Sequence, residues 1–167
     1  MTNIYKDILK AKENQKKLLA ILLDPDKIVW EKLEILISNI NQSPATHVFI
    51  GGSLVESSRM DELIIRLQQK INLPMVLFPG NPSQISNEAD AILFLSLLSG
   101  RNPDYLIGHQ VAAAPILKKS ALEIISTGYI LIESGNETAV TRISKTTPMD
   151  RFNLELVVAT AQAGEML

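Results

Sequence analysis

Residues 18–27 read LLAILLDPDK, a continuous apolar run that ends in a charged turn. A strand buried on one face alternates apolar and polar residues, whereas a strand buried on both faces is apolar throughout. The run therefore predicts a strand of a parallel sheet that is covered on both faces. Further runs of the same kind occur at residues 47–50 (HVFI), 75–78 (MVLF), 91–98 (AILFLSLL) and 124–132 (IISTGYILI).

Helical patterns fill the stretches between these runs. Residues 31–40 and 61–70 carry leucine and isoleucine at spacings of three and four, which puts an apolar stripe on one side of a helix. Asp104 and Asn153 are good capping residues and mark two further helix starts. The order predicts a helix over residues 2–16 and then five strand–loop–helix units, which is an α/β fold with right-handed crossovers.

Composition narrows the class of protein. The 167 residues are 46% apolar and carry a net charge of −2, which excludes general disorder and argues against a nucleic-acid partner. Cysteine is absent, so disulfides, thiolate metal sites and cysteine nucleophiles are excluded. The N-terminus lacks the apolar stretch of a signal peptide, and no segment reaches the roughly 18 apolar residues of a membrane span. We expect a cytoplasmic protein with a single domain over residues 1–167.

Two architectures suit this order of elements. A flavodoxin-like doubly wound sheet holds five such units, whereas a TIM-like (β/α)8 barrel needs eight strands and about 250 residues. Length alone favours the doubly wound sheet. Both architectures bind ligands at the carboxyl ends of the strands, so the residues that follow each apolar run are the candidate site residues.

Asp24, Asp26 and Lys27 follow the first run. Two carboxylates and an ammonium at this point could hold Mg²⁺ and a phosphate, because Mg²⁺ prefers carboxylate oxygen and shares its shell with substrate oxygens. The alternative is a proline turn in which Asp26 caps a helix that begins near Ile28. The residues alone leave both interpretations open.

Gly51, Gly52 and Ser53 follow the second run. Two glycines let the backbone approach a ligand, and a serine hydroxyl can join a metal or phosphate shell. A tight strand-to-helix connection explains the same residues. Taken alone, this motif is therefore a weak indication of a site.

The later runs offer fewer chemical groups. Phe78 begins an uncharged stretch that we interpret as an apolar wall. Arg101 could meet a diphosphate, although an exposed arginine ahead of a helix is the commoner case. Tyr129 is more typical of a core aromatic with its hydroxyl at the rim than of a catalytic group.

Other common catalytic and nucleotide-binding motifs are absent from the sequence. His47 and His109 have no second ligand at zinc spacing, and there is no Walker, Gly-x-Gly-x-x-Gly or Gly-x-Ser-x-Gly turn.

Five motifs taken in order resemble the geranylgeranylglyceryl phosphate synthase family, which includes the bacterial heptaprenylglyceryl phosphate synthases. The resemblance covers nearly the whole chain and is closest to the longer bacterial and archaeal subgroup, which has the Asp-Pro-Asp-Lys and Ser-Gly-Arg-Asn-Pro forms. The motifs are at residues 22–27 (LLDPDK), 49–53 (FIGGS), 77–80 (LFPG), 96–103 (SLLSGRNP) and 128–132 (GYILI).

The resemblance implies a TIM-like barrel of which this chain covers the first five βα units. It implies a prenyltransferase that joins a polyprenyl diphosphate, geranylgeranyl above all, to the 3-hydroxyl of sn-glycerol 1-phosphate and releases pyrophosphate. By the matching positions, Asp24 and Ser53 would be Mg²⁺ ligands. The positions implied to bind substrate are Lys27, Gly51, Gly52, Arg101 and Tyr129, with Phe78, Leu97 and Leu98 along a groove for the hydrocarbon tail.

The family continues with a strand that bears Tyr-Leu-Glu-Ala-Gly-Ser-Gly and with two glycine-rich loops, which together bind the glycerol phosphate. This anchor has no counterpart here, so we expect the sequence to be part of a longer barrel chain. The resemblance also implies a homo-oligomer, a dimer or a hexamer, and peripheral membrane contact for the lipid product. A non-catalytic phosphate-binding or assembly module is the alternative function.

Overall fold

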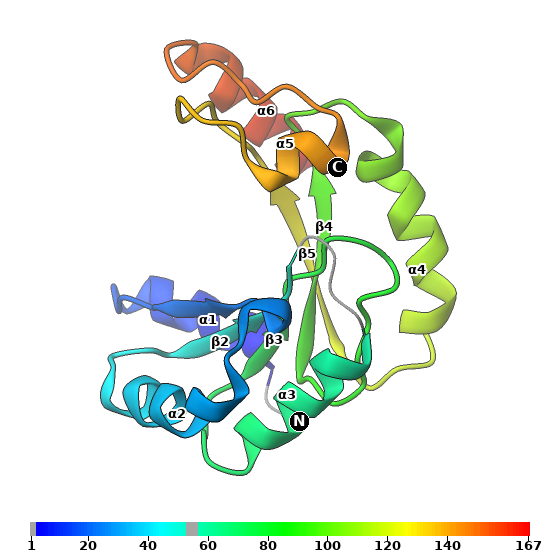
Figure 1. The fold of residues 1–167 in the computed structure, drawn as a ribbon. Coiled ribbons are helices and arrows are strands. Elements are labelled where there is room, and N and C mark those ends of the chain that lie inside the picture. The colour runs from blue at the N-terminus through cyan, green and yellow to red at the C-terminus, as the bar shows by residue number, and fades with distance from the viewer. Residues whose placement is uncertain (1–2, 53–56) are drawn as a thin grey trace. The chain divides into compact units, whose positions relative to one another are not determined.

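The computed structural model describes residues 3–52 and 57–167. The chain forms two compact units (Figure 1). The first comprises Met1–Leu93 with Lys119–Ile125, and the second comprises Phe94–Lys118 with Ser126–Leu167. The prediction of a single domain stays a prediction.

The chain contains a five-stranded parallel sheet, whose strand order decides between the two architectures. The strands are β1 (Ala20–Leu23), β2 (His47–Ile50), β3 (Met75–Leu77), β4 (Ala91–Leu97) and β5 (Glu123–Tyr129), and they lie in the order β1-β2-β3-β4-β5. A flavodoxin-like sheet has the order 2-1-3-4-5, so the doubly wound alternative is wrong. Consecutive order is that of a barrel, in which each strand pairs with the next.

The register of the sheet brings the strand ends to one level. Leu23 pairs with Ile50, Ile50 pairs with Leu77, and Leu77 pairs with Ile92. The residues that follow β1, β2 and β3 therefore start from the same edge of the sheet. This edge is where the sequence predicts the site.

Helices cover the sheet of the first unit, and the apolar stripes of residues 31–40 and 61–70 predict two of them. The prediction that the first strand is covered on both faces is wrong, because Leu22 of β1 is 54% exposed. The helices are α1 (Ile4–Glu13), α2 (Leu33–Gln42) and α3 (Ser57–Gln68), and two short 3-10 turns, η1 (Pro25–Lys27) and η2 (Trp30–Lys32), precede α2. Burial of each large aliphatic side chain contributes about 1.5–3 kcal/mol. The buried side chains are Leu33, Ile37 and Ile40 of α2, Met60, Leu63, Ile64 and Leu67 of α3, and Val48, Ile50, Met75 and Leu77 of the strands.

The start of α1 is anchored to β5 by a carboxylate. Asn3 caps the helix by accepting from the backbone N–H of Lys6 at 2.7 Å. The Glu123 carboxylate accepts from the N–H groups of Ile4 at 2.6 Å and Tyr5 at 2.9 Å. These free N–H groups and the positive end of the helix dipole favour a negative charge at this point. The contact joins residues 118 and 119 positions apart in the chain.

The connection from β3 to β4 departs from the predicted strand–loop–helix repeat. Residues 78–90 contain no helix. Pro79 and Pro82 remove backbone donors and disfavour helical geometry at the residues before them. The backbone N–H of Gly80 donates instead to Oε1 of the fully buried Gln84 at 2.7 Å. The prolines and this buried amide hold the connection as an ordered loop.

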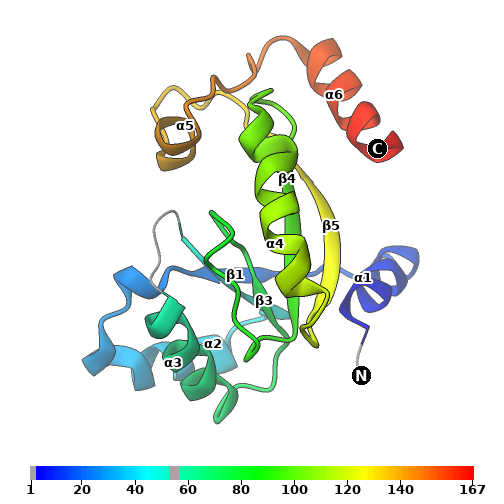
Figure 2. The ribbon, with the colours of Figure 1, turned by 90° about the vertical axis from the view of Figure 1, so that its right-hand side faces the viewer.

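The second unit contains the C-terminal parts of β4 and β5 and the helices that follow α3 in the described part of the chain. A π-helical turn, η3 (Asp104–Gly108), leads into α4 (His109–Leu117), and α5 (Ala139–Ser144) and α6 (Leu154–Met166) follow. The helix α4 runs along β4 (Figure 2), and Nε2 of Gln110 donates to the carbonyl of Leu95. No helix in the described part of the chain is long and apolar enough to cross a membrane.

One of the two predicted caps in this unit is correct. Asn153 caps α6 by accepting from the N–H of Leu156 at 3.2 Å. The prediction that Asp104 is a cap is wrong, because Oδ1 of Asn102 accepts from the Asp104 N–H at 3.0 Å. Asn102 precedes Pro103 and is therefore held outside the helix, where its side chain can turn back to the backbone.

His47 is held as a neutral side chain at the start of β2. The Thr46 hydroxyl lies 3.0 Å from the carbonyl of Leu19 and 2.8 Å from Nδ1 of His47, and its oxygen accepts from the N–H of Leu19 at 3.0 Å. The imidazole is thus hydrogen-bonded to the hydroxyl of its neighbour. Burial lowers the pKa of His47 below its usual range, against a smaller opposing effect from the charge of Asp7.

We predict that this histidine makes the fold less stable in acid. Unfolded histidine has a pKa of about 6.5, and the folded pKa is lower, so the unfolded chain binds more protons near that pH. The free energy of unfolding should fall as the pH drops from about 6.5 through the folded pKa of His47. Between pH 8 and pH 5, urea unfolding should show a smaller decrease in the free energy of unfolding for His47→Asn than for the wild type. Equal decreases would contradict the lowered pKa of His47.

Candidate functional site

Backbone hydrogen bonds join the carboxyl ends of the first three strands. The N–H of Gly51 donates to the carbonyl of Leu23 at 3.0 Å, and the N–H of Phe78 donates to the carbonyl of Ile50 at 2.8 Å. The ladder thus continues one residue beyond the strands. It sets the Asp24 turn and the glycine motif next to each other.

Asp24 caps the turn that follows β1. Its Oδ1 accepts from the N–H of Asp26 at 3.2 Å, and Pro25 occupies the first position of the turn, where a missing N–H costs nothing. The interpretation in which Asp26 caps a helix near Ile28 is therefore wrong, since the cap is Asp24. The Asp24 side chain keeps 21% of its surface exposed, so its carboxylate is accessible.

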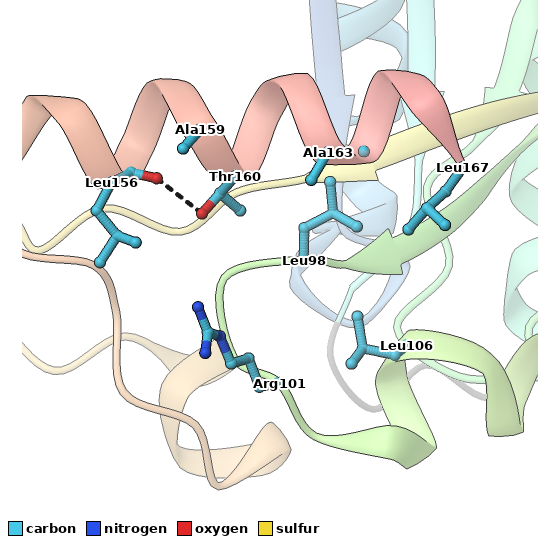
Figure 3. Close-up of a pocket in the computed structure, with 9 residues that line it drawn as sticks. Leu98, Arg101, Leu106, Leu156, Ala159, Thr160, Ala163 and Leu167 are labelled. Atoms are coloured by element: carbon cyan, nitrogen blue, oxygen red, sulfur yellow. Dashed lines mark hydrogen bonds between the residues drawn. The ribbon is translucent and has the colours of Figure 1, made fainter.

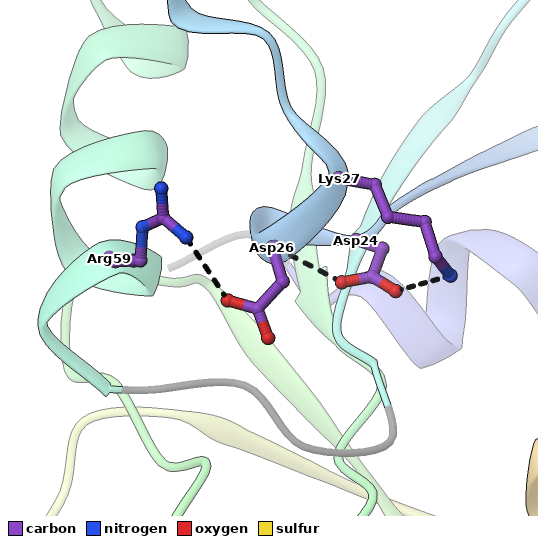
Figure 4. Close-up of polar contacts among 4 residues, drawn as sticks. All are labelled: Asp24, Asp26, Lys27 and Arg59. Carbon is purple, nitrogen blue, oxygen red and sulfur yellow. Dashed lines mark hydrogen bonds and ion pairs between the residues drawn. The ribbon is translucent and has the colours of Figure 1, made fainter.

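Lys27 forms an ion pair with Asp24. The distance from Lys27 Nζ to Asp24 Oδ2 is 2.7 Å (Figure 4), and the lysine side chain is otherwise in solvent. The hydrogen bond to Asp24, and then the negative charge of that carboxylate, raise the pKa of Lys27 above its usual value. Lys27 is therefore a cation throughout the physiological pH range.

The glycine motif leaves room for the carboxylate. A Cβ atom on Gly52 would lie 2.7 Å from Oδ1 and 2.8 Å from Cγ of Asp24. A Cβ atom on Gly51 would overlap the backbone carbonyl of Phe78. Gly51 is therefore required by close approach to the next strand, whereas a side chain at Gly52 would displace the Asp24 carboxylate.

A second ion pair joins the same turn to α3. Asp26 Oδ1 lies 3.6 Å from Nη1 of Arg59 (Figure 4). No motif in the sequence predicts a role for Arg59. Its position in the first turn of the helix after the glycine motif is the signal that could have indicated it. Each carboxylate of the turn thus has its own basic partner.

The described side chains at the carboxyl edge of the sheet could provide one ligand, the Asp24 carboxylate, to a metal ion. The described residues hold no group of three or more acidic or histidine side chains that could bind a metal. Mg²⁺ is commonly held by one or two carboxylates while substrate oxygens and water fill the shell. Asp24, accessible and facing the Gly52 backbone, fits such a role. Ser53, the other predicted ligand, lies outside the described residues.

Arg101 belongs to the second unit and lies in a loop whose backbone conformation is fixed by contacts of its neighbours. The residue has a positive φ of 50°, and the next side chain, Asn102, donates to the carbonyl of Ser144 at 2.8 Å. A Cβ atom on Gly100 would overlap Thr146. The predicted binding residue Arg101 is therefore held by its neighbours on both sides.

Arg101 lies at an apolar pocket of about 260 Å³ in the second unit (Figure 3). Leu98 of the predicted groove lines the same pocket. The remaining lining residues are mainly aliphatic: Leu106, Leu156, Ala159, Thr160, Ala163, Gly164 and Leu167.

Tyr129 ends β5 in the second unit. Its carbonyl accepts from the N–H of Leu98 at 2.8 Å, and burial raises the pKa of its hydroxyl. The phenol therefore stays protonated at neutral pH. Of the predicted site residues, Asp24, Lys27, Gly51 and Gly52 meet in the first unit, whereas Arg101 and Tyr129 belong to the second.

Comparison with known proteins identifies the family. The chain matches the PcrB family over residues 7–167. The chain belongs to the PcrB family. This PcrB-family chain is 71% identical to the geranylgeranylglyceryl phosphate synthase of Flavobacterium johnsoniae over 167 residues, which are 100% of the chain and 69% of that protein. The synthase of the archaeon Korarchaeum cryptofilum is 37% identical over 158 residues, 95% of the chain and 65% of that protein.

Two solved structures have the same fold. The (S)-3-O-geranylgeranylglyceryl phosphate synthase of Thermoplasma acidophilum, in complex with its substrate sn-glycerol-1-phosphate, matches with a TM-score of 0.90 at 30% identity. The wild-type enzyme of Thermoplasma volcanium matches with a TM-score of 0.90 at 27% identity. Each match includes 99% of the PcrB-family chain and 66% of the solved chain. The PcrB-family chain therefore spans about two thirds of the length of these enzymes. The predicted family and the predicted partial TIM-like barrel are confirmed, with five consecutive strands of which the third is followed by a loop instead of a helix.

We predict that the two adjacent glycines respond differently to alanine. Gly51→Ala should lower the free energy of unfolding by about 1–3 kcal/mol or more, because its methyl group would meet a backbone carbonyl that cannot move alone. Gly52→Ala should cost about 1 kcal/mol or less, because the Asp24 side chain can rotate away. Urea unfolding of both variants tests this difference, and a Gly51→Ala protein as stable as the wild type would contradict it.

Proposed function

We propose that this PcrB-family chain takes part in transfer of a polyprenyl group, geranylgeranyl above all, from its diphosphate to the 3-hydroxyl of sn-glycerol 1-phosphate. The observation that carries the proposal is the 71% identity to a geranylgeranylglyceryl phosphate synthase along the whole chain. The Asp24 turn and its glycine cradle add a physical reason, because they place one accessible carboxylate at the edge where barrel enzymes bind substrate.

In the reaction, the allylic C–O bond of the prenyl diphosphate breaks and pyrophosphate leaves. A lone pair of the glycerol hydroxyl forms the new C–O bond to the allylic carbon, and the hydroxyl proton goes to solvent. The main demand on the protein is to stabilise the negative charge that builds on the leaving diphosphate. Basic side chains and a divalent cation meet that demand.

We assign Mg²⁺ to Asp24 and Ser53, with substrate oxygens completing its shell. When bound, the ion would neutralise charge on the leaving group as a Lewis acid. Asp24 is prepared for this role because the Asp26 N–H holds Oδ1 of its carboxylate and Gly52 has no side chain to displace the carboxylate. The assignment of Ser53 rests on its place in the glycine motif.

The remaining residues are proposed to bind substrate. Lys27, with Gly51 and Gly52, would face the diphosphate or the glycerol phosphate. Arg101 would pair with diphosphate oxygens, since a guanidinium binds such groups through two parallel hydrogen bonds. Tyr129 would lie along the prenyl chain, and the apolar pocket that contains Leu98 suits part of a hydrocarbon tail.

Substrates, assembly and location are also part of the proposal. The partners would be a polyprenyl diphosphate and sn-glycerol 1-phosphate, the compound bound in the Thermoplasma acidophilum structure. We propose a homo-oligomer, a dimer or a hexamer, that works in the cytoplasm and meets the membrane surface when its lipid product leaves.

We predict that Asp24→Asn reduces prenyl transfer by about 100-fold or more, because it removes the negative charge that holds the metal but keeps the size of the side chain. Product formation from labelled sn-glycerol 1-phosphate and geranylgeranyl diphosphate should be followed by mass spectrometry. Mg²⁺-dependent binding of the diphosphate is a second readout that needs no acceptor.

Asp26→Asn is the matched control for this experiment. It makes the same charge change on the same turn, but its side chain pairs with Arg59 rather than facing Gly52. We expect this control to retain most of the activity and diphosphate binding. An Asp24→Asn protein that matches the control would overturn the metal assignment. A wild type that includes the glycerol-phosphate anchor and binds phosphate without forming product would favour a non-catalytic binding module.

A further inference from the structure

The two oxygens of the Asp24 carboxylate have partners of different kinds. Oδ1 accepts from the backbone N–H of Asp26 at 3.2 Å, a donor that the turn itself holds in place. Oδ2 accepts from the side-chain ammonium of Lys27 at 2.7 Å. A metal ion that binds Oδ2 therefore meets an oxygen that already has a cation.

The Lys27 contact is the one that can be released. The lysine side chain is 81% exposed, against 21% for Asp24, so its ammonium can return to water without disturbing the core. Exposed ion pairs of this kind are weakly held. The four-carbon stem of lysine lets the same ammonium reach a new anion nearby.

The other cation near the turn, Arg59 of α3, contacts a different carboxylate. Arg59 pairs with Asp26 at 3.6 Å, so the other carboxylate of the turn has its own partner. Release of Lys27 would thus leave Asp24 as the turn's uncompensated charge. A divalent cation that replaces Lys27 restores the balance and adds a positive charge that attracts a diphosphate.

We infer that Lys27 is an exchangeable counter-ion of Asp24, which occupies the metal-binding oxygen in the free protein and moves to the diphosphate when the metal binds. The inference rests on the proposed assignment of Asp24 as a metal ligand. In the metal-free protein, Lys27 thus positions the Asp24 carboxylate. In the metal-bound protein, it binds the diphosphate of the substrate. It links metal binding to diphosphate binding.

The inference predicts changes of opposite sign in one variant. Lys27→Met keeps the apolar stem and removes the ammonium. Its affinity for Mn²⁺ alone, used as the probe for a divalent cation, should rise by about 2- to 5-fold, the range expected for loss of an exposed competing ion pair. Its affinity for inorganic pyrophosphate in saturating Mn²⁺ should fall by about tenfold, because a charge-assisted hydrogen bond is lost.

Isothermal titration calorimetry on the 167-residue chain measures both affinities. Arg59→Met is the matched control, because it removes a cation near the same turn that contacts Asp26 and not Asp24. Its Mn²⁺ affinity should stay within about twofold of the wild type, as expected for a screened exposed charge. An equal rise in both variants would mean a general field effect and would overturn the inference.

Two outcomes separate failure of the inference from failure of the proposed function. Unchanged or weaker Mn²⁺ binding by Lys27→Met, with Mn²⁺ binding lost in Asp24→Asn, would overturn the counter-ion role alone. Mn²⁺ binding by Asp24→Asn equal to that of the wild type would overturn the metal assignment itself. Circular dichroism melting curves confirm that each variant is folded, and Lys27→Gln replaces Lys27→Met if the latter is not.

Discussion

The close approach of β2 to β3 at Gly51 is the constraint on which the site depends. Gly51 lies against the carbonyl of Phe78 with no room for a side chain, and its N–H bonds to the carbonyl of Leu23. These contacts hold three strand ends at one level. The next residue, Gly52, lies against the carboxylate of Asp24.

Electrostatics at this edge follow from a turn in which opposite charges are paired locally. Asp24 pairs with Lys27 and Asp26 pairs with Arg59, so the turn is nearly neutral before any ligand binds. A neutral turn with one accessible carboxylate suits a substrate that brings its own negative oxygens. A pocket built only from protein carboxylates would repel such a substrate.

The elements of this fold could be predicted from the sequence where the signal is local. Unbroken apolar runs predict the strands, and Asn153 caps its helix as its residue type indicates. Strand order depends on pairing between distant segments, so length alone pointed to the wrong architecture. The role of Asp24 as the cap and the contact of Arg59 also required the fold, since each depends on how a turn meets a neighbouring element.

The central claim is that Asp24 provides the protein's metal contact at the carboxyl edge of the sheet. Crystals of the chain grown with Mn²⁺ and pyrophosphate would test it through anomalous scattering of the metal. The account predicts an anomalous peak at about 2.0–2.2 Å from a carboxylate oxygen of Asp24, with pyrophosphate oxygens on the same ion. Pyrophosphate bound together with a Mn²⁺ ion that is coordinated elsewhere would contradict it.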